Sequence, residues 1–325
     1  MSSQPRNFGS EHYRGFLSRQ GQSFYDQLNQ QFLREDYSGQ TRFSLSEPET
    51  AASDGFAAFK ALKDDHPEYF FLGFQSEFTR CGTNGTLTYP ILYSHDVIKR
   101  INQQLRKSIY RIVRGTAHLQ VIEREILVYE RIAKKLSYTN NSDVRDHSVV
   151  GPVLLSSGVC EGHNALLMLC LRRIGIPCIK VYGKTEKDGW HCWTVAWVDG
   201  LPVHCDVTWD GESEGVVRFN YFNLTDKQIA LDHYCFRSKR VPVCESEGMD
   251  YYSYYNLRVK SFNELRCRLR TESKRDLPIR IHFDYHPVCG DYFKEAQKAI
   301  TAEQISGRHS LCFHPTTKNL IIKKM

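Results

Sequence analysis

The chain has 325 residues, which is enough for one large domain or for two packed units. Its composition, 41% hydrophobic and 25% charged, is ordinary for a soluble globular protein and excludes wholesale disorder. The net charge of +6 is spread along the chain in short basic pairs, so it favours a solvated surface over a nucleic-acid groove.

Cysteine usage and the absence of targeting patterns indicate the compartment. The eleven cysteines are an odd number and form no Cys-x-x-Cys pair, which favours free thiols in a reducing environment. The first residues lack the basic and apolar pattern of an export signal, and no apolar run reaches membrane-spanning length. We therefore expect a cytoplasmic protein. No P-loop or dinucleotide fingerprint occurs, so no organic cofactor is expected.

The first part of the chain predicts a flexible tail at 1–12 and a helical N-terminal region at 13–117 that carries one hairpin. Apolar residues recur at helical spacing between 13 and 34 and again at 55–63, with a polar loop between them. The dipeptide Asn84-Gly85 stands between two β-rich runs and predicts the hairpin turn.

Two longer amphipathic helices, at 94–115 and 117–138, lead to a third helix that begins at Cys160. A polar, turn-rich segment separates the second helix from the third. The third helix ends cleanly, because Gly175 can adopt the left-handed conformation and Pro177 prevents continuation.

A strand at 178–183 is followed by two strands that Asp199-Gly200 joins as a two-residue turn. That turn places Trp193 opposite Asp206, and it makes His191 a diagonal neighbour of Asp206 on the same face. Their backbones then lie about 7 Å apart, a gap that one imidazole–carboxylate hydrogen bond spans. The other face is almost entirely apolar, so we expect it to be buried against a helix.

Two His-Cys steps, His191-Cys192 and His204-Cys205, raise the question of a zinc site. Neighbouring residues of a strand point to opposite faces, and His191 and His204 are separated by roughly 13 Å along the hairpin. Such groups cannot converge on one ion with metal–sulfur distances of about 2.3 Å. The pattern therefore favours buried core thiols, and no metal is expected there.

Cys160 differs from the other cysteines because it begins a helix. A buried cysteine acting as a small hydrophobe is the commoner case, and Cys170 and Cys178 fit it. At a helix start, however, free backbone N–H groups and the helix dipole favour the thiolate. Gly158 and Gly162 flank this thiol and leave room for a substrate backbone.

A thiolate at a helix start, facing a His–Asp pair, is the arrangement that nucleophilic catalysis requires. Cys160 would attack an amide carbonyl to form a thioester, and His191 would carry the proton to the leaving amine. Asp206 would orient the imidazole. The backbone N–H of Cys160 would be one oxyanion donor. The second donor would come from one of three residues: Tyr138, Asn140 or Trp193.

Three stretches resemble the motif blocks of the transglutaminase-like superfamily, a branch of papain-like thiol enzymes: "GVCEGHNALLMLCLRRIGIPC", "GWHCWTVAWVDG" and "VHCDVTWD". The resemblance is strong over about 118–235, and it matches the family's Cys, His and Asp to Cys160, His191 and Asp206. The later "NYFNLTDKQIALDH" is similar to the segment that follows this Asp in bacterial members.

The resemblance implies an α+β fold in which the Cys helix packs on a central antiparallel sheet. This core would occupy 118–240. The alternation of helical and strand patterns at 250–325, where we expect strands at 251–260 and 278–286 and two helices, predicts a small α/β region with a helix-covered sheet.

The sequence departs from the family pattern in two places. His163 stands where many members have an aromatic residue, and Cys192-Trp193-Thr194 replaces the usual Ala-Trp-Asn. Neither change removes a triad member, but both alter the substrate pocket. His163 lies one turn from Cys160 and either packs facing solvent or supplies a second base in the pocket.

The resemblance implies amide chemistry, which in this family includes cross-linking, deamidation and peptide cleavage. We expect a cysteine-dependent enzyme that acts on a protein or peptide substrate, with hydrolysis ahead of amine transfer because water is always available. The alternative is an inactive scaffold that binds a protein or peptide partner. A nucleic-acid role for 250–325 is disfavoured, because alternate strand residues face a core.

The resemblance also raises the question of a calcium site, because the family's vertebrate transglutaminases are calcium-dependent. The nearest candidate is "WDGESEG", with Asp210, Glu212 and Glu214. The spacing is not that of an EF-hand, and a solvated turn is the favoured interpretation.

Overall fold

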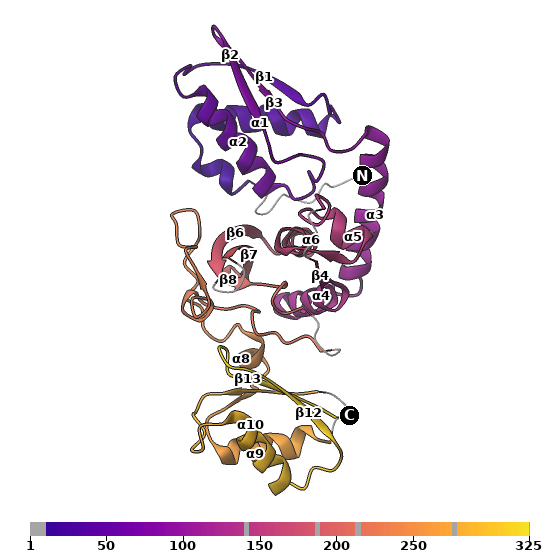
Figure 1. Cartoon of the computed structure of the whole chain (residues 1–325), viewed down its shortest axis with the longest axis vertical. Helices are drawn as coiled ribbons and strands as arrows, with labels where there is room; N and C mark the ends of the chain where they lie inside the picture. Colours follow the sequence, from indigo (N-terminus) through magenta and orange to yellow (C-terminus); the bar gives the residue numbers. More distant parts are fainter. Residues whose placement is uncertain (1–10, 140–142, 186–188, 212–215, 275–277, 325) are drawn as a thin grey trace.

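The computed structural model describes residues 11–139, 143–185, 189–211, 216–274 and 278–324. The chain has three parts that follow one another along its longest axis, with the N-terminal region at one end and the C-terminal region at the other (Figure 1). Within the described ranges, no helix has both the length and the apolar character needed to cross a bilayer.

The N-terminal region packs two helices against a small antiparallel sheet of order β1-β3-β2. Its elements are η1 (Tyr13–Phe16), α1 (Arg19–Leu33), β1 (Gln40–Ser44), α2 (Ala51–Asp65), β2 (Glu77–Cys81) and β3 (Asn84–Thr88). The two predicted helices are present. β1, however, lies in a segment predicted to be a polar loop, and it forms because alternate residues Thr41 and Phe43 are buried.

The predicted hairpin is present, but its turn was placed two residues too late. Cys81 pairs with Asn84, so the turn residues are Gly82 and Thr83, and Gly82 has the positive φ (60°) that such a turn needs. Gly85 is inside β3 for another reason, since a Cβ there would lie 2.4 Å from the Phe78 ring.

Four helices form the first half of the central region: α3 (His95–Val113), α4 (Val121–Lys135), α5 (Val150–Leu154) and α6 (Cys160–Arg173). α6 is apolar around most of its circumference because α3, α4, α5 and the sheet all pack against it. It ends as predicted, with Gly175 in the left-handed conformation at φ 84°.

The second half of the central region is an antiparallel sheet of order β8-β7-β6-β9. Its strands are β6 (Cys178–Thr185), β7 (Gly189–Val198), β8 (Leu201–Cys205) and β9 (His233–Tyr234). The Asp199-Gly200 turn is confirmed, with φ values of 50° and 82°, and so is the register from Val198 opposite Leu201 outward. The predicted packing of the Cys helix on an antiparallel sheet is therefore present.

The ladder between β7 and β8 stops earlier than the register predicts. β8 ends at Cys205, so Asp206 does not pair with Trp193 in the ladder. The Asp206 N–H donates instead to the Tyr221 carbonyl at 2.9 Å, and Asp206 Oδ1 accepts from the backbone N–H groups of Thr208 and Trp209. These bonds start a turn, which frees the edge of β7 at 189–193 on this side.

Both faces of this sheet are buried. α6 covers one face, and its Asn164 side chain bonds the Trp193 carbonyl and the Thr194 hydroxyl. The segment after β8 covers the other face, where Phe236 contacts the rings of Trp193 and His204. The short elements here are β4 (Ser137–Tyr138), β5 (Ser157–Gly158) and α7 (Asp226–Ile229), and the Thr225 side chain caps α7.

The C-terminal region has a hydrophobic core of its own beneath a four-stranded sheet of order β10-β11-β13-β12. Its elements are α8 (Tyr251–Tyr254), β10 (Arg258–Val259), α9 (Phe262–Glu272), β11 (Ile279–Phe283), α10 (Tyr292–Ala302), β12 (His309–His314) and β13 (Asn319–Lys324). The two predicted helices and the strand predicted at 278–286 are confirmed.

The predicted strand over 251–260 is mostly wrong. Residues 251–254 form α8 because the Asp250 side chain accepts the N–H groups of Tyr252 and Ser253 and so caps a helix. Tyr251 stacks on Phe219 at a centroid distance of 4.0 Å, which ties this helix to the central region.

Candidate active site

Cys160 is the first residue of α6, directly after β5, and its side chain is partly exposed. The predicted role of its glycines as space for a substrate is wrong. A Cβ on Gly162 would lie 2.5 Å from the Asp146 carbonyl oxygen and 2.8 Å from that of Ser148, and a Cβ on Gly158 would lie 3.2 Å from Asp146. The glycines let the start of α6 pack against the preceding loop, which fixes the position of the thiol.

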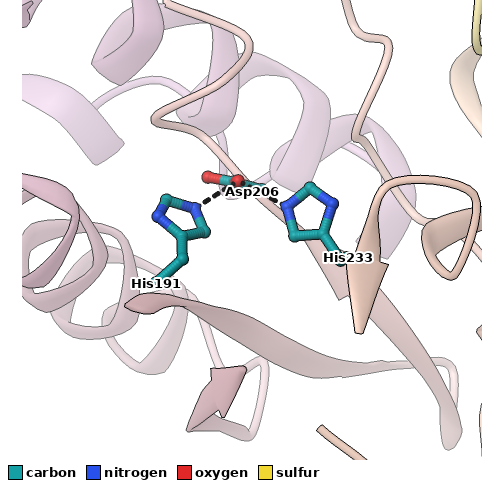
Figure 2. A group of neighbouring side chains, drawn as sticks. All are labelled: His191, Asp206 and His233. Carbon is teal, nitrogen blue, oxygen red and sulfur yellow. Dashed lines mark hydrogen bonds and ion pairs between the residues drawn. The ribbon is translucent and has the colours of Figure 1, made fainter. Parts of the chain in front are cut away.

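His191 and Asp206 meet beside the free edge of β7. The imidazole Nε2 lies 2.7 Å from Asp206 Oδ2, which is the hydrogen bond that the hairpin register predicts (Figure 2). Both side chains are buried, at 4% and 1% exposure for the two residues. Nε2 is thus held by the carboxylate, and the interaction with Cys160 helps to raise the pKa of the imidazole.

The charges of the three residues reinforce one another. Burial alone would lower the pKa of His191, but the Asp206 carboxylate and the Cys160 thiolate outweigh burial and raise it to about 10. Burial would raise the pKa of Asp206, yet His191 and a second histidine hold it well below its usual range. The imidazole is therefore a cation beside an anionic carboxylate.

Cys192 was predicted to be only a buried core thiol, but its side chain also interacts with that of Cys160. Its thiol donates a hydrogen bond to the Cys160 sulfur, the largest cause of a Cys160 pKa lowered to about 5. Burial opposes this shift, while the His191 imidazolium and the Cys192 backbone N–H add to it. The same contact raises the pKa of Cys192, so that thiol stays protonated and keeps donating.

A second imidazole, that of His233 at the start of β9, also bonds Asp206. His233 Nε2 lies 3.2 Å from Asp206 Oδ2 (Figure 2). His233 Nδ1 lies 2.6 Å from Asp232 Oδ1. Burial would lower its pKa, but the two carboxylates raise it. His233 was not singled out from the sequence, although it ends the "NYFNLTDKQIALDH" segment, and that resemblance was the available signal.

Two clusters of side chains contain atoms of the kind that bind metal ions. His191, Asp206 and His233 bring three ligand-type atoms within 4.8 Å of one another, but those atoms already hydrogen-bond each other. His204 forms a similar buried group with Asp226 and Cys244. Its Nε2 bonds Asp226 at 2.8 Å and its Nδ1 accepts from the Trp193 indole, so both ring nitrogens are committed to these bonds. The two His-Cys steps thus lie in separate clusters.

Asp210, a candidate calcium ligand in the acidic loop, is not placed to bind that ion. This residue is fully buried, not in a solvated turn, and its carboxylate accepts from the Tyr129 hydroxyl and from the N–H groups of Asn220 and Tyr221. These bonds occupy the oxygens that calcium would need. Glu212 and Glu214 lie outside the described residues.

Three residues, Tyr138, Asn140 and Trp193, were predicted as candidates for the second oxyanion donor. Trp193 is wrong for this role, because its buried indole N–H donates to His204 at 3.0 Å. Tyr138 lies in β4, opposite Gly158 of β5, and is 54% exposed next to the approach to Cys160. Asn140 lies outside the described residues. Tyr138 therefore stays a prediction for the second donor.

His163 does not face solvent. It is 3% exposed, it lies near the Tyr138 ring, and its pKa is lowered by burial to about 4 despite a hydrogen bond to the Ser137 backbone. The ring is therefore neutral near pH 7. Its Nε2 has no hydrogen-bond partner within the described part of the chain.

Comparison with known proteins agrees with this geometry. The sequence model of the transglutaminase-like superfamily matches residues 106–207, which run from α3 through β8 and include Cys160, His191 and Asp206. The chain contains a transglutaminase-like domain. No curated protein sequence matches the chain.

Two solved structures are similar to parts of the chain. One is a TGase, with 12% identity, a TM-score of 0.31, and coverage of 54% of this chain and 53% of its own. The other is a candidate cysteine protease from Cytophaga hutchinsonii, with 15% identity, a TM-score of 0.29, and coverage of 42% and 62%. The chain thus spans about half to three fifths of these structures.

Proposed function

We propose that the transglutaminase-like domain is a cysteine-dependent enzyme that acts on amide bonds of a protein or peptide through a thioester. The observation that carries the proposal is the imidazole of His191, which Asp206 holds at 2.7 Å and whose charge, with Cys192, lowers the pKa of the Cys160 thiol at the start of α6. This is the combination of nucleophile, base and orienting carboxylate that acyl transfer needs.

The reaction follows from the charges of these groups. The Cys160 thiolate attacks the carbonyl carbon, a C–S bond forms, and the proton on His191 goes to the amine as the C–N bond breaks. The Cys160 backbone N–H, at the start of α6, stabilises the oxyanion. Water then attacks the thioester while His191 accepts its proton, and a carboxylate product leaves with the thiolate restored. An amine that replaces water gives transfer in place of hydrolysis.

The test is to trap the acyl-enzyme. Wild type and Cys160→Ser are incubated with a mixed peptide library, quenched in acid and examined by intact mass and peptide mapping. We expect an acyl adduct on Cys160, accompanied by amide cleavage or ammonia release that Cys160→Ser loses by at least 100-fold, ~2.7 kcal/mol. Cys178→Ser, in the apolar core of β6, is the control for losing a thiol. Peptide binding without any adduct or turnover would instead support the scaffold alternative.

A further inference from the structure

A cavity of about 650 Å³ lies between the N-terminal region and the transglutaminase-like domain. α2 and the segment after it form one side, and the start of α6, β6 and the start of β7 form the other. Glu161 and Trp190 belong to its wall and are the chain neighbours of Cys160 and His191. This volume is in the range of sites that bind small ligands or short peptide segments.

The wall of this cavity is largely aromatic. Phe59, Phe74, Tyr182 and Trp190 line it, and Phe74 and Trp190 are 58% and 73% exposed. Exposed aromatic side chains gathered at the mouth of a cavity are typical of binding sites. Much of this wall lies outside residues 106–207, so the superfamily match does not account for it.

Three lysines line the same cavity: Lys60, Lys63 and Lys180. The Asp64 carboxylate forms ion pairs with two of them. Lys60 Nζ lies 2.7 Å from Asp64 Oδ2, and the buried Lys180 Nζ lies 3.7 Å from Asp64 Oδ1. Asp64 also accepts a hydrogen bond from the Tyr182 hydroxyl at 2.7 Å. The oxygens of this carboxylate are therefore fully used.

Lys63 has no carboxylate within 4 Å among the residues that the structure describes. Its Nζ donates to the Gly73 carbonyl at 2.6 Å and lies 4.2 Å from the centre of the Phe74 ring. Burial, and then repulsion by Lys180, lower the pKa of Lys63 to about 8. Glu161 is the second carboxylate on the wall, and its Oε2 lies 2.8 Å from His147 Nδ1. Positive charge thus exceeds negative charge around Lys63.

We propose that this cavity binds a carboxylate-bearing side chain of the peptide substrate, with its apolar part against Phe74 and Trp190 and its carboxylate on Lys63. The inference rests on the proposed function and names the substrate class: peptides with an acidic residue close to the amide that is attacked. A carboxylate would give Lys63 the ion pair that it lacks, in a partly dry site where such a pair is worth more than on the surface.

The first experiment compares quenched peptides that differ only by Glu or Gln at one position near the cleaved amide. For wild type we expect a Glu preference in kcat/KM of at least tenfold at one position. Lys63→Met should reduce that preference to about one, and Lys63→Arg should keep most of it. Lys99→Met, on the exposed face of α3, is the matched control and should keep all of it.

The second experiment separates this inference from the proposed function. Cys160→Ala is titrated with the same Glu and Gln peptides by calorimetry, with and without Lys63→Met. Cys160→Ala binding that favours Glu and depends on Lys63, together with a wild type that turns over no peptide, would uphold the cavity and overturn the proposed reaction. Turnover without a Glu preference, or a preference that Lys63→Met leaves intact, would overturn the cavity's role. Unchanged thermal unfolding of Lys63→Met shows that the variant is folded.

Discussion

At the residue scale, side chains other than those of Cys160, His191 and Asp206 also form hydrogen bonds in the site. Asp206 is shared by two imidazoles, and one of these, His233, is itself held between Asp206 and Asp232. A carboxylate that accepts from two cations is fixed in one orientation, which in turn fixes the ring of His191. His233 is therefore a positioning residue for His191.

This role leads to a prediction for His233→Gln, which removes the charge but keeps a polar side chain. We expect kcat to fall roughly tenfold, ~1.4 kcal/mol in the barrier, with KM nearly unchanged because no substrate contact is lost. Steady-state kinetics on a cleaved peptide measure the effect, with the exposed His118→Gln as control. A kcat equal to that of wild type would show that His233 only fills space.

The sequence predicted the His191–Asp206 contact because a two-residue turn fixes which residues share a face. It did not predict Cys192 as a donor to Cys160 or His233 as a partner of Asp206. Both depend on how separate segments fold back on the free edge of β7, and strand register carries no information about segments outside the hairpin. The indole of Trp193 was misassigned for a different reason: its acceptor His204 lies in the same hairpin, but strand register does not fix the side-chain rotamers that bring the two rings together.

At the element scale, the position of the thiol depends on how tightly the start of α6 packs. Gly162 lies against the carbonyl oxygens of Asp146 and Ser148, at distances that no side chain could occupy without movement. The same loop accepts the N–H of Val159, the residue that precedes the helix, at 3.1 Å. The helix start is thus held on the side opposite the sheet.

Gly162→Ala should shift this helix start and destabilise the protein. We expect a loss of roughly 1–3 kcal/mol in the free energy of unfolding, because the added methyl overpacks the loop. Urea unfolding followed by circular dichroism measures the change. Gly15→Ala, where a Cβ meets nothing within 4 Å, is the control and should be nearly neutral. A Gly162→Ala protein as stable as wild type would contradict the packing account.

The elements themselves were predicted best where periodicity was strong. α3 and α4 have long apolar stripes, and α6, β6 and β7 are long runs of mostly buried residues. Elsewhere, a capping side chain or strand pairing gave a structure that the composition of the segment did not predict. Asp250 turned an aromatic run into α8, and the pairing of β1 with β3 used a segment that is polar on one face.

At the scale of the whole molecule, the N-terminal region and the transglutaminase-like domain share one hydrophobic core, whereas the C-terminal region has its own. The predicted boundary at 117/118 cuts between α3 and α4, and both of these helices pack on α6. A pattern read along the chain cannot reveal that two regions share a core. The cavity with Lys63 exists because they do, since each region supplies one side of it.

The central claim is that this assembly turns the sulfur of Cys160 into a thiolate at a pH where an ordinary thiol is protonated. Its pKa is lowered to about 5 and that of His191 is raised to about 10, so the thiolate and imidazolium coexist between these values. Below about 5 the sulfur gains a proton and reactivity is lost.

The most direct test is the rate of iodoacetamide alkylation at Cys160 between pH 4 and 9, measured by peptide mapping with the exposed Cys81 of β2 as an internal reference. We expect the Cys160 rate to stay near its plateau down to about pH 5 and to fall below it, and we expect His191→Ala to move the midpoint upward. A wild-type midpoint near that of an ordinary thiol, ~8.5, would contradict the account.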